Sequence, residues 1–298
     1  MAERHMSSDD TAEKLNALRG ILTDMRSVLL AFSGGVDSTF LLKVASEVMP
    51  DRVLAVTALS ATYPQEEHKK ACEMARRLGV RHLSISTDEL SDPNFASNPV
   101  RRCYFCKKAL FTRLREISAR EDLACVIDAS NLDDCSDYRP GREAAEELGV
   151  RSPLVEARLT KADIRALSRE MGLPTWDQPS MACLASRFPY GEQITPEKLH
   201  RVEQAERMLR ELGLGQVRVR SHGRLARIEV DEARVQELAM PGVRQEVLRK
   251  LKSLGFVYVT VDLEGYRTGS LNEVLRSQDS ADGEGGEDGA SPAREAPK

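Results

Sequence analysis

The sequence predicts an α/β protein, with a parallel sheet covered by helices on both faces and a smaller α+β unit after it. Short apolar strands alternate with amphipathic helices over the first part of the chain, and a glycine loop joins the first strand to the next helix. Near residue 195 the pattern changes to strands in which polar and apolar residues alternate. Regular alternation of strand and helix favours a parallel sheet, because its strands are joined by crossover helices.

Apolar residues at helical spacing predict the first helix over 12–27. The predicted elements that follow are a buried strand at 28–32, a helix that includes 40–45, a strand at 52–59, a helix at 65–78, a strand at 81–87, a helix near 104–119, a strand at 124–130 and a helix at 162–172. Thr160 or Lys161 opens that last helix, and Gly172 with Pro174 ends it.

The second unit begins with a helix at 196–212 and continues with two strands in 217–230, joined by a turn at His222-Gly223. Further helices and a strand at 256–263 complete it. We therefore predict a flexible N-terminus over 1–11, a nucleotide-binding domain over 12–178, an α+β domain over 179–276 and a disordered tail over 277–298. The tail is rich in Gly, Ser, Asp, Glu and Pro, a composition that cannot offset the entropy of ordering.

The composition, with 41% hydrophobic and 30% charged residues among 298, is typical of a soluble globular chain. It contains no run of about 20 apolar residues and no apolar core of a signal peptide near its start, so we expect a cytoplasmic protein without a membrane partner. The net charge of −4 disfavours general binding to nucleic acid. Six cysteines in such a protein indicate metal binding or catalysis rather than disulfides.

The segment SGGVDS, residues 33–38, lies between a predicted buried strand and a helix. Free backbone N–H groups and the positive end of a helix dipole bind anions at such a place. Gly34 and Gly35 allow the main chain to approach a phosphate, while Ser33 and Ser38 supply hydroxyl groups. Asp37 is a candidate ligand for Mg²⁺, which would neutralise the phosphates of ATP. The alternative is a tight turn with a capping serine.

This loop resembles the PP-loop of the ATP-pyrophosphatase superfamily, which has the adenine nucleotide alpha hydrolase-like fold. The resemblance implies ATP as cofactor with Mg²⁺, cleavage between the α and β phosphates, and adenylation of a substrate. It also implies an adenine contact at Ser60, which follows the second strand. Members include amide-forming synthetases, tRNA thiolases and sulfur transferases.

Further segments resemble the LarE family of ATP-dependent sulfur transferases, over roughly residues 15 to 275. They are WDQPSMACLASRFPYG at 176–191, DYRPG at 137–141, VRVR and ARIE within 217–230, and GYRTG at 265–269. The resemblance implies that Cys183 supplies the sulfur, in some members by losing its own sulfur and becoming dehydroalanine. It also implies a homo-oligomer. We expect Arg187, four residues on, to lower the pKa of this thiol. A buried core cysteine is the alternative.

Cys103 and Cys106 are three residues apart, a spacing that lets two thiols hold one metal or cluster. LarE proteins with these two cysteines and the equivalent of Cys183 are thought to bind a [4Fe–4S] cluster that relays sulfur. We favour this cluster over a sacrificial Cys183, and a structural zinc is a third option. Packing explains Cys72 and Cys125, whereas the role of Cys135 stays open.

Candidate substrate ligands come from two further regions. Asp137 and Arg139 follow the fourth strand at the carboxyl edge of the sheet, where α/β proteins bind ligands, although a solvated loop is the alternative. Arg218 and Arg220 lie on one face of a strand, with Arg227 on its expected partner. Such a cluster suits a phosphate monoester. A charged solvent face would have the same pattern, but the LarE resemblance implies a role for these arginines, and for Arg187, in substrate binding.

The favoured function is an ATP-dependent sulfur transferase of nickel-pincer cofactor synthesis. By resemblance, it would adenylate a carboxylate of a pyridinium mononucleotide-type substrate and convert it to a thiocarboxylate, releasing pyrophosphate and AMP. Sulfide or a sulfur-donor protein would be the partner. The alternatives are an amide-forming or tRNA-thiolating PP-loop enzyme and a non-catalytic ATP-binding redox sensor.

Overall fold

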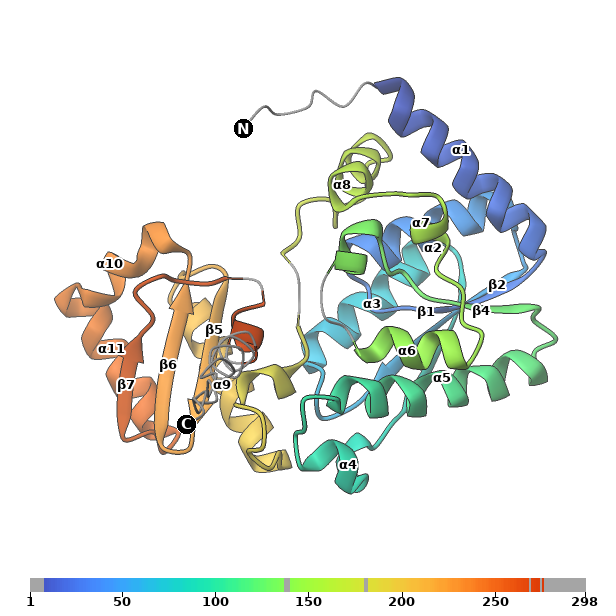
Figure 1. The fold of residues 1–298 in the computed structure, drawn as a ribbon. Coiled ribbons are helices and arrows are strands. Elements are labelled where there is room, and N and C mark those ends of the chain that lie inside the picture. The colour runs from blue at the N-terminus through green and yellow to red at the C-terminus, as the bar shows by residue number, and fades with distance from the viewer. Residues whose placement is uncertain (1–7, 137–139, 180–181, 268, 274, 276–298) are drawn as a thin grey trace, which may run out of the picture.

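The first unit of the computed structural model is built on a four-stranded sheet in the order β3-β2-β1-β4, with every pairing parallel. The structure describes residues 8–136, 140–179, 182–267, 269–273 and 275. The strands are β1 (Val28–Ala31), β2 (Val53–Leu59), β3 (Arg81–Ser86) and β4 (Cys125–Ile127). The predicted parallel sheet is therefore confirmed (Figure 1).

Helices cover both faces of this sheet (Figure 1). They are α1 (Ser8–Met25), α2 (Val36–Val48), α3 (Gln65–Arg77), α4 (Pro93–Ala96), α5 (Arg102–Arg120), α6 (Pro140–Glu147), α7 (Pro153–Glu156) and α8 (Lys161–Glu170). Because side chains alternate along a strand, Val28 and Leu30 of β1 belong to one core, with α1 and α2, whereas Leu29 belongs to another, with α5. Within the described ranges no helix is long and apolar enough to cross a membrane.

The second unit holds a three-stranded sheet in the order β5-β6-β7. Its elements are α9 (Pro196–Glu211), β5 (Val217–His222), β6 (Leu225–Val230), α10 (Val235–Ala239), α11 (Pro241–Ser253) and β7 (Tyr258–Val261). The predicted hairpin is confirmed, because β5 and β6 pair antiparallel and Gly223 occupies the turn with a φ of 61°. β7 then pairs with β6 in parallel.

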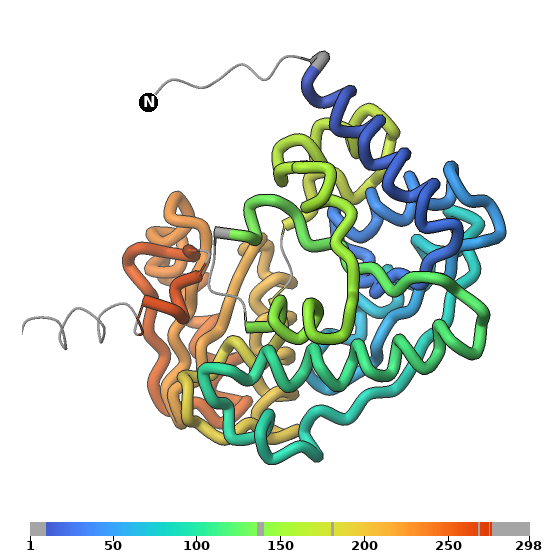
Figure 2. The backbone as a smooth tube through the Cα atoms, turned by 45° about the vertical axis from the view of Figure 1, so that its right-hand side comes forward, coloured from blue at the N-terminus to red at the C-terminus, as the bar shows by residue number. Residues whose placement is uncertain are grey.

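The sequence patterns did not reveal α4, α6 or α7, of which α4 and α7 span four residues each. Helix α4 matters for the architecture because its Phe95 is buried in the core of the second unit. Close by, the backbone N–H of Gly191 donates to the carbonyl of Asn98 at 2.8 Å, and that of Ile194 donates to Ala96 at 2.8 Å. These contacts lay the chain that leads into α9 against the start of α5 (Figure 2).

Candidate active site

The phosphate loop is a sharp turn between β1 and α2. Gly34 has a φ of +72°, and a Cβ at this position would lie 2.8 Å from the Cα of Ala71 in α3. The hydroxyls of Ser33 and Ser38 lie 3.0 Å apart inside the turn. Gly35 caps α2 without a side-chain hydrogen bond, so the first amides of the helix are directed at the loop. The turn thus has the form of an anion site.

Asp37 lies in the first turn of α2, beside this anion site. Its Oδ2 accepts a hydrogen bond from Nζ of Lys161 at 2.5 Å, and its buried Oδ1 has no partner among the described residues. Burial raises the pKa of Asp37, although Lys161 opposes this effect. A carboxylate oxygen without a partner next to a phosphate site fits a Mg²⁺ ligand, as predicted for Asp37. Lys161 was noted in the sequence only as a helix opener.

A cavity of about 270 Å³ opens beside the loop, at the carboxyl ends of β2 and β3. The residues that line it are Leu59, Ser60, Ala61, Tyr63, Gln65, Ser86, Thr87 and Glu203. Ser60 thus lines this cavity just after β2, and its predicted contact with adenine stays a prediction. Glu203 comes from α9 of the second unit, and its Oε1 accepts a hydrogen bond from the backbone N–H of Gln65 at 3.3 Å.

The turn at Ser60–Pro64 connects the phosphate loop with the segment that carries Cys183. The hydroxyl of Tyr63 donates to the carbonyl of Ser33 at 2.6 Å. The carbonyl of Thr62, one residue earlier, accepts the N–H of Leu184 at 2.9 Å. A single short turn thus hydrogen-bonds both the phosphate loop and the residue that follows Cys183.

A short 3₁₀ turn at Leu184–Arg187 follows Cys183 and is held by buried arginines. Nη1 of Arg187 donates to the carbonyls of Ala182 and Cys183 at 3.1 and 3.2 Å. Its Nε and Nη2 donate to the two carboxylate oxygens of Glu206 at 2.7 and 3.1 Å. In this structure the buried guanidinium of Arg187 therefore shapes the Cys183 turn. Arg102 also holds this turn, because its Nη1 donates to the carbonyl of Ala185 at 2.9 Å.

Burial raises the pKa of the Cys183 thiol, and the charge of Arg102 is the main opposing influence. The backbone N–H of Ala185 and the hydroxyl of Thr62 also favour the thiolate. The expectation that Arg187 lowers the pKa of Cys183 below its usual value is wrong, because desolvation outweighs the nearby cation. Arg102, which the sequence patterns did not single out, is the cation that acts on this thiol.

Cys103 and Cys106 lie in the first turn of α5 and are directed toward the same region as Cys183. Burial raises the pKa of Cys106 to about 12, and the charges of Cys183 and Cys103 add to this effect. The charges of the three predicted thiols thus influence one another, and their joint role stays a prediction. Within the described ranges, no group of three such ligands is close enough for a single metal ion.

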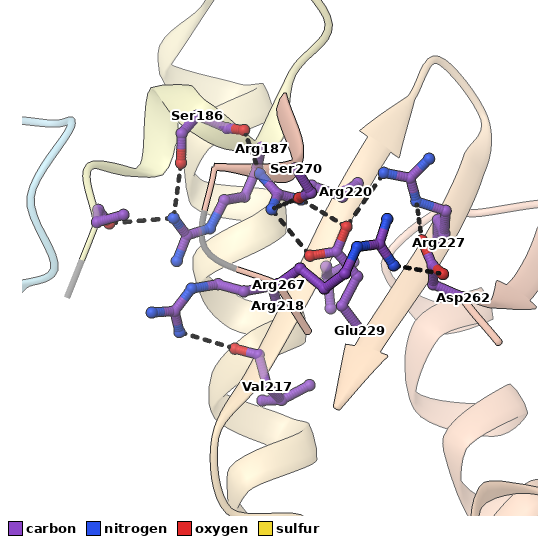
Figure 3. Close-up of polar contacts among 12 residues, drawn as sticks. Ser186, Arg187, Val217, Arg218, Arg220, Arg227, Glu229, Asp262, Arg267 and Ser270 are labelled. Carbon is purple, nitrogen blue, oxygen red and sulfur yellow. Dashed lines mark hydrogen bonds and ion pairs between the residues drawn. The ribbon is translucent and has the colours of Figure 1, made fainter. Parts of the chain in front are cut away.

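The arginines of the second unit form a cluster whose positive charge is partly balanced by carboxylates such as Glu229 and Asp262 (Figure 3). Arg220 pairs in bidentate fashion with Glu229 at 2.9 and 2.8 Å, and Arg227 donates to the same carboxylate at 3.1 Å. Arg218 is buried over the ring of Tyr266 at 5.2 Å. Burial and the neighbouring Arg187 lower the pKa of Arg218. A negative charge close to Arg218 would therefore stabilise its charged form.

The predicted candidates thus fall into two groups that meet at the Cys183 turn. On one side, Tyr63 is bonded to the phosphate loop, and Thr62 is bonded to both Ser60 and Leu184. On the other side, Arg220 donates to the carbonyl of Ser186 at 2.7 Å. Asp137 and Arg139 lie outside the described residues. Thr62, Arg102 and Lys161 were missed because no motif marks them. Their roles depend on contacts with residues far away in the sequence.

Sequence comparisons relate the chain to known proteins. A sequence model of the NAD synthase family matches residues 15–126. The chain is 42% identical over 265 residues to the pyridinium-3,5-bisthiocarboxylic acid mononucleotide synthase of Lactiplantibacillus plantarum, which covers 89% of this chain and 95% of that protein. It is 46% identical to the uncharacterized protein slr1717 of Synechocystis sp., over 88% and 98% of the two chains. The NH(3)-dependent NAD(+) synthetase of Chlorobaculum parvum is 26% identical over 50% of this chain and 54% of its own.

Glu206→Gln tests whether the buried ion pair holds the Cys183 turn. The substitution leaves Arg187 buried without its carboxylate, so we expect a loss of about 3 to 5 kcal/mol in the free energy of unfolding. Burial would raise the pKa of Glu206, but Arg187 holds that pKa below its ordinary value of 4.5. The stability from this carboxylate is therefore present above about pH 4.5 and is lost as the pH falls further.

Urea unfolding as a function of pH measures both effects. The variant should lack the wild-type component of stability loss below about pH 4.5. Glu246→Gln, which removes one partner of an exposed ion pair with Arg249, is the matched control and should leave stability nearly unchanged. Equal stability of Glu206→Gln and wild type would contradict this role of the ion pair.

Proposed function

Since this chain belongs to the LarE family of ATP-dependent sulfur transferases, we propose that it converts a carboxylate of a pyridinium mononucleotide into a thiocarboxylate. The observation that carries the proposal is the turn at 60–64, which hydrogen-bonds both the phosphate loop and the Cys183 turn. The 42% identity extends over 265 residues, and so includes both units. This extent favours sulfur transfer over the amide-forming, tRNA-thiolating and sensor alternatives.

ATP would bind with its phosphates at Ser33–Ser38 and its nucleoside in the cavity beside Ser60. Backbone amides at the start of α2 would hold the phosphates, and Asp37 would hold Mg²⁺ through its unpartnered oxygen. Once the metal binds Asp37, the ammonium group of Lys161 becomes available to the phosphates. These contacts would neutralise the negative charge of the ATP phosphates, which the substrate carboxylate must approach.

Adenylation then needs only an oriented substrate. A carboxylate oxygen attacks the α-phosphorus, and the bond from that phosphorus to the oxygen bridging to the β-phosphorus breaks. Pyrophosphate leaves with the electron pair, and an acyl-adenylate remains. The protein contributes by position and charge, because no side chain forms a covalent bond in this step.

The sulfur step follows at the Cys183 turn. Sulfide attacks the acyl carbon, the bond from that carbon to the AMP oxygen breaks, and AMP leaves with the electron pair as the thiocarboxylate forms. If the sulfur of Cys183 itself attacks, a thioester to the protein forms instead, and loss of the Cα proton with cleavage of the Cβ–Sγ bond then releases the thiocarboxylate and leaves dehydroalanine. Thr62, the backbone N–H of Ala185 and the charge of Arg102 favour the thiolate of Cys183.

The arginine cluster is suited to the phosphate of the mononucleotide. Arg187, Arg218 and Arg220 come together around the two buried carboxylates Glu206 and Glu229, which leaves an excess of positive charge in the described part of the cluster. Arg227 joins the same network through Glu229. We propose that Arg218 and Arg220 face the phosphate monoester, with Arg187 and Arg227 supporting them, and that Asp137 and Arg139 contribute from their loop.

We also propose that Cys103, Cys106 and Cys183 hold a [4Fe–4S] cluster. The donor chemistry fits, because three thiols lie near one another and a cluster spans more space than one ion. When bound, the cluster would supply an iron with an open position for a non-protein sulfide. Metal binding would also release the protons that burial keeps on Cys106 and Cys183. Sulfide or a sulfur-donor protein would replace the sulfur that each turnover consumes. We propose that the enzyme is a homo-oligomer and that it acts in nickel-pincer cofactor synthesis.

Cys183→Ala separates the two steps of the reaction. The variant should release pyrophosphate from ATP in a substrate-dependent manner, because the phosphate loop is intact. Its yield of thiocarboxylate should fall by at least about 100-fold, as expected when a reacting group is removed. Chromatography of AMP, pyrophosphate and the thioacyl product measures both steps. Cys72→Ala on α3 is the matched control and should resemble wild type. Thiocarboxylate formation by Cys183→Ala at the wild-type rate would contradict the proposal.

Anaerobic purification tests the cluster separately. Wild type should contain iron and acid-labile sulfide and absorb visible light, whereas Cys103→Ala should lose both. Cys125→Ala, which removes a thiol in β4, should retain them. A colourless, iron-free wild type that loses the sulfur of Cys183 after turnover would instead establish the sacrificial route.

A further inference from the structure

Glu203 lines the nucleotide cavity, although it lies on α9 of the second unit. Its Oε1 accepts the backbone N–H of Gln65, at the start of α3, at 3.3 Å. Among the described residues, this carboxylate has no other hydrogen bond and no ion pair. Its second oxygen is therefore available to a ligand in the cavity.

The helix that carries Glu203 is firmly anchored. Val202 and Ala205, close to Glu203 on α9, are buried in the core of the second unit. Glu206, one turn further along the helix, accepts two hydrogen bonds from buried Arg187 at 2.7 and 3.1 Å. The carboxylate of Glu203 is therefore presented to the cavity from a rigid element, as a binding group should be.

The cavity wall offers this carboxylate no compensating charge, because Glu203 is the one charged residue among the described residues that line it. A carboxylate accepts hydrogen bonds and donates none, so the part of a nucleotide that faces Glu203 must be a donor. The triphosphate is excluded, since like charges repel one another. The donors that remain are the two neighbouring hydroxyl groups of the ribose and the amino group of adenine.

The position of Glu203 favours the ribose. The predicted adenine contact at Ser60 lies at the end of β2, whereas Glu203 lies beside the start of α3, next to Gln65. Tyr63, two residues before Gln65, donates to the carbonyl of Ser33 in the phosphate loop at 2.6 Å. Glu203 is thus on the side of the cavity that leads to this loop, and the sugar is what joins the base to the phosphates. Carboxylates bind ribose hydroxyls in other α/β nucleotide-binding folds as well.

We propose that Glu203 is a specificity-determining residue that binds the ribose hydroxyls of ATP and so selects ribonucleotides over nucleotides without these hydroxyls. The inference rests on the proposed function, in which the nucleoside of ATP occupies this cavity. One oxygen of the carboxylate stays on the N–H of Gln65, and the other accepts from the ribose. The second unit is then part of the nucleotide site, because α9 supplies the group that recognises the sugar.

Calorimetry on the full chain, purified anaerobically, measures the dissociation constants of ATP, 2′,3′-dideoxy-ATP and ITP with Mg²⁺ and without a carboxylate substrate. The readout is the ratio of the dideoxy-ATP constant to the ATP constant, because a general structural effect changes both constants together. Glu203→Ala removes the carboxylate, and Glu203→Gln keeps an oxygen for Gln65 but removes the charge. Glu66→Gln is the matched control, because Glu66 lies in the first turn of α3 but is not among the residues that line the cavity.

We expect wild type and Glu66→Gln to bind ATP at least about 10-fold more tightly than dideoxy-ATP, as hydrogen bonds to a charged group imply. The ratio should approach unity in Glu203→Ala and be intermediate in Glu203→Gln, because a neutral amide oxygen is a weaker acceptor. A wild-type ratio near unity overturns the proposal, and so does a full wild-type ratio in either Glu203 variant. If Glu203→Ala instead changes only the ratio of ITP to ATP, the carboxylate faces adenine and the proposal is also overturned.

Binding requires no turnover, so the role of Glu203 and the proposed function are tested separately. A wild type that binds ATP and dideoxy-ATP equally well overturns the role of Glu203 and leaves sulfur transfer standing. A wild type that prefers ATP through Glu203 supports this role even if it forms no thiocarboxylate. A wild type that binds no ATP overturns both.

Discussion

The structure depends on the short turn between β2 and α3, which is bonded on one side to the phosphate loop and on the other to the Cys183 turn. An acyl-adenylate reacts readily with water, so a sulfur nucleophile must be within reach when the adenylate forms. Two adjacent residues serve this requirement, because Tyr63 is bonded to the phosphate loop and Thr62 is bonded to the Cys183 turn. The two halves of the chemistry, which are about 145 positions apart in the sequence, become neighbours through a few hydrogen bonds.

Buried charge explains how the second unit is arranged around the same turn. The guanidinium groups of Arg187 and Arg220 are desolvated, and each is stabilised by a buried glutamate and by carbonyls of the turn. Removing a charge of either sign would leave an uncompensated ion. Arg218 adds another buried cation, which lies over the ring of Tyr266. Burial also keeps the thiols of Cys106 and Cys183 protonated until a cation or an activated substrate is present.

Much of the fold followed from local patterns. The alternation of β1, α2, β2, α3 and β3, the glycine loop and the hairpin at Gly223 all have strong sequence signals. Thr160 or Lys161 was expected to open the helix at 162–172, and the structure begins α8 at Lys161 with Thr160 as its cap. The short helices α4 and α7 escaped because four residues carry too little periodicity.

Site residues could be proposed from the sequence where chemistry requires a particular residue type, as at Asp37 and Cys183. Sequence patterns could not identify residues that act through distant partners. Lys161 reaches Asp37, and Arg102 reaches the Cys183 turn, only after the chain has folded. The expected effect of Arg187 on the Cys183 thiol failed for a related reason, since proximity in sequence says nothing about desolvation.

An adenosine derivative with a chloroacetamido group at its 5′ carbon tests the shared pocket most directly. The nucleoside cavity would hold the adenosine and place the electrophile near the phosphate loop, facing Cys183. We expect peptide mass spectrometry to show selective labelling of Cys183 that ATP with Mg²⁺ prevents. Saturation of the cavity by this compound with Cys183 left unlabelled would contradict the account.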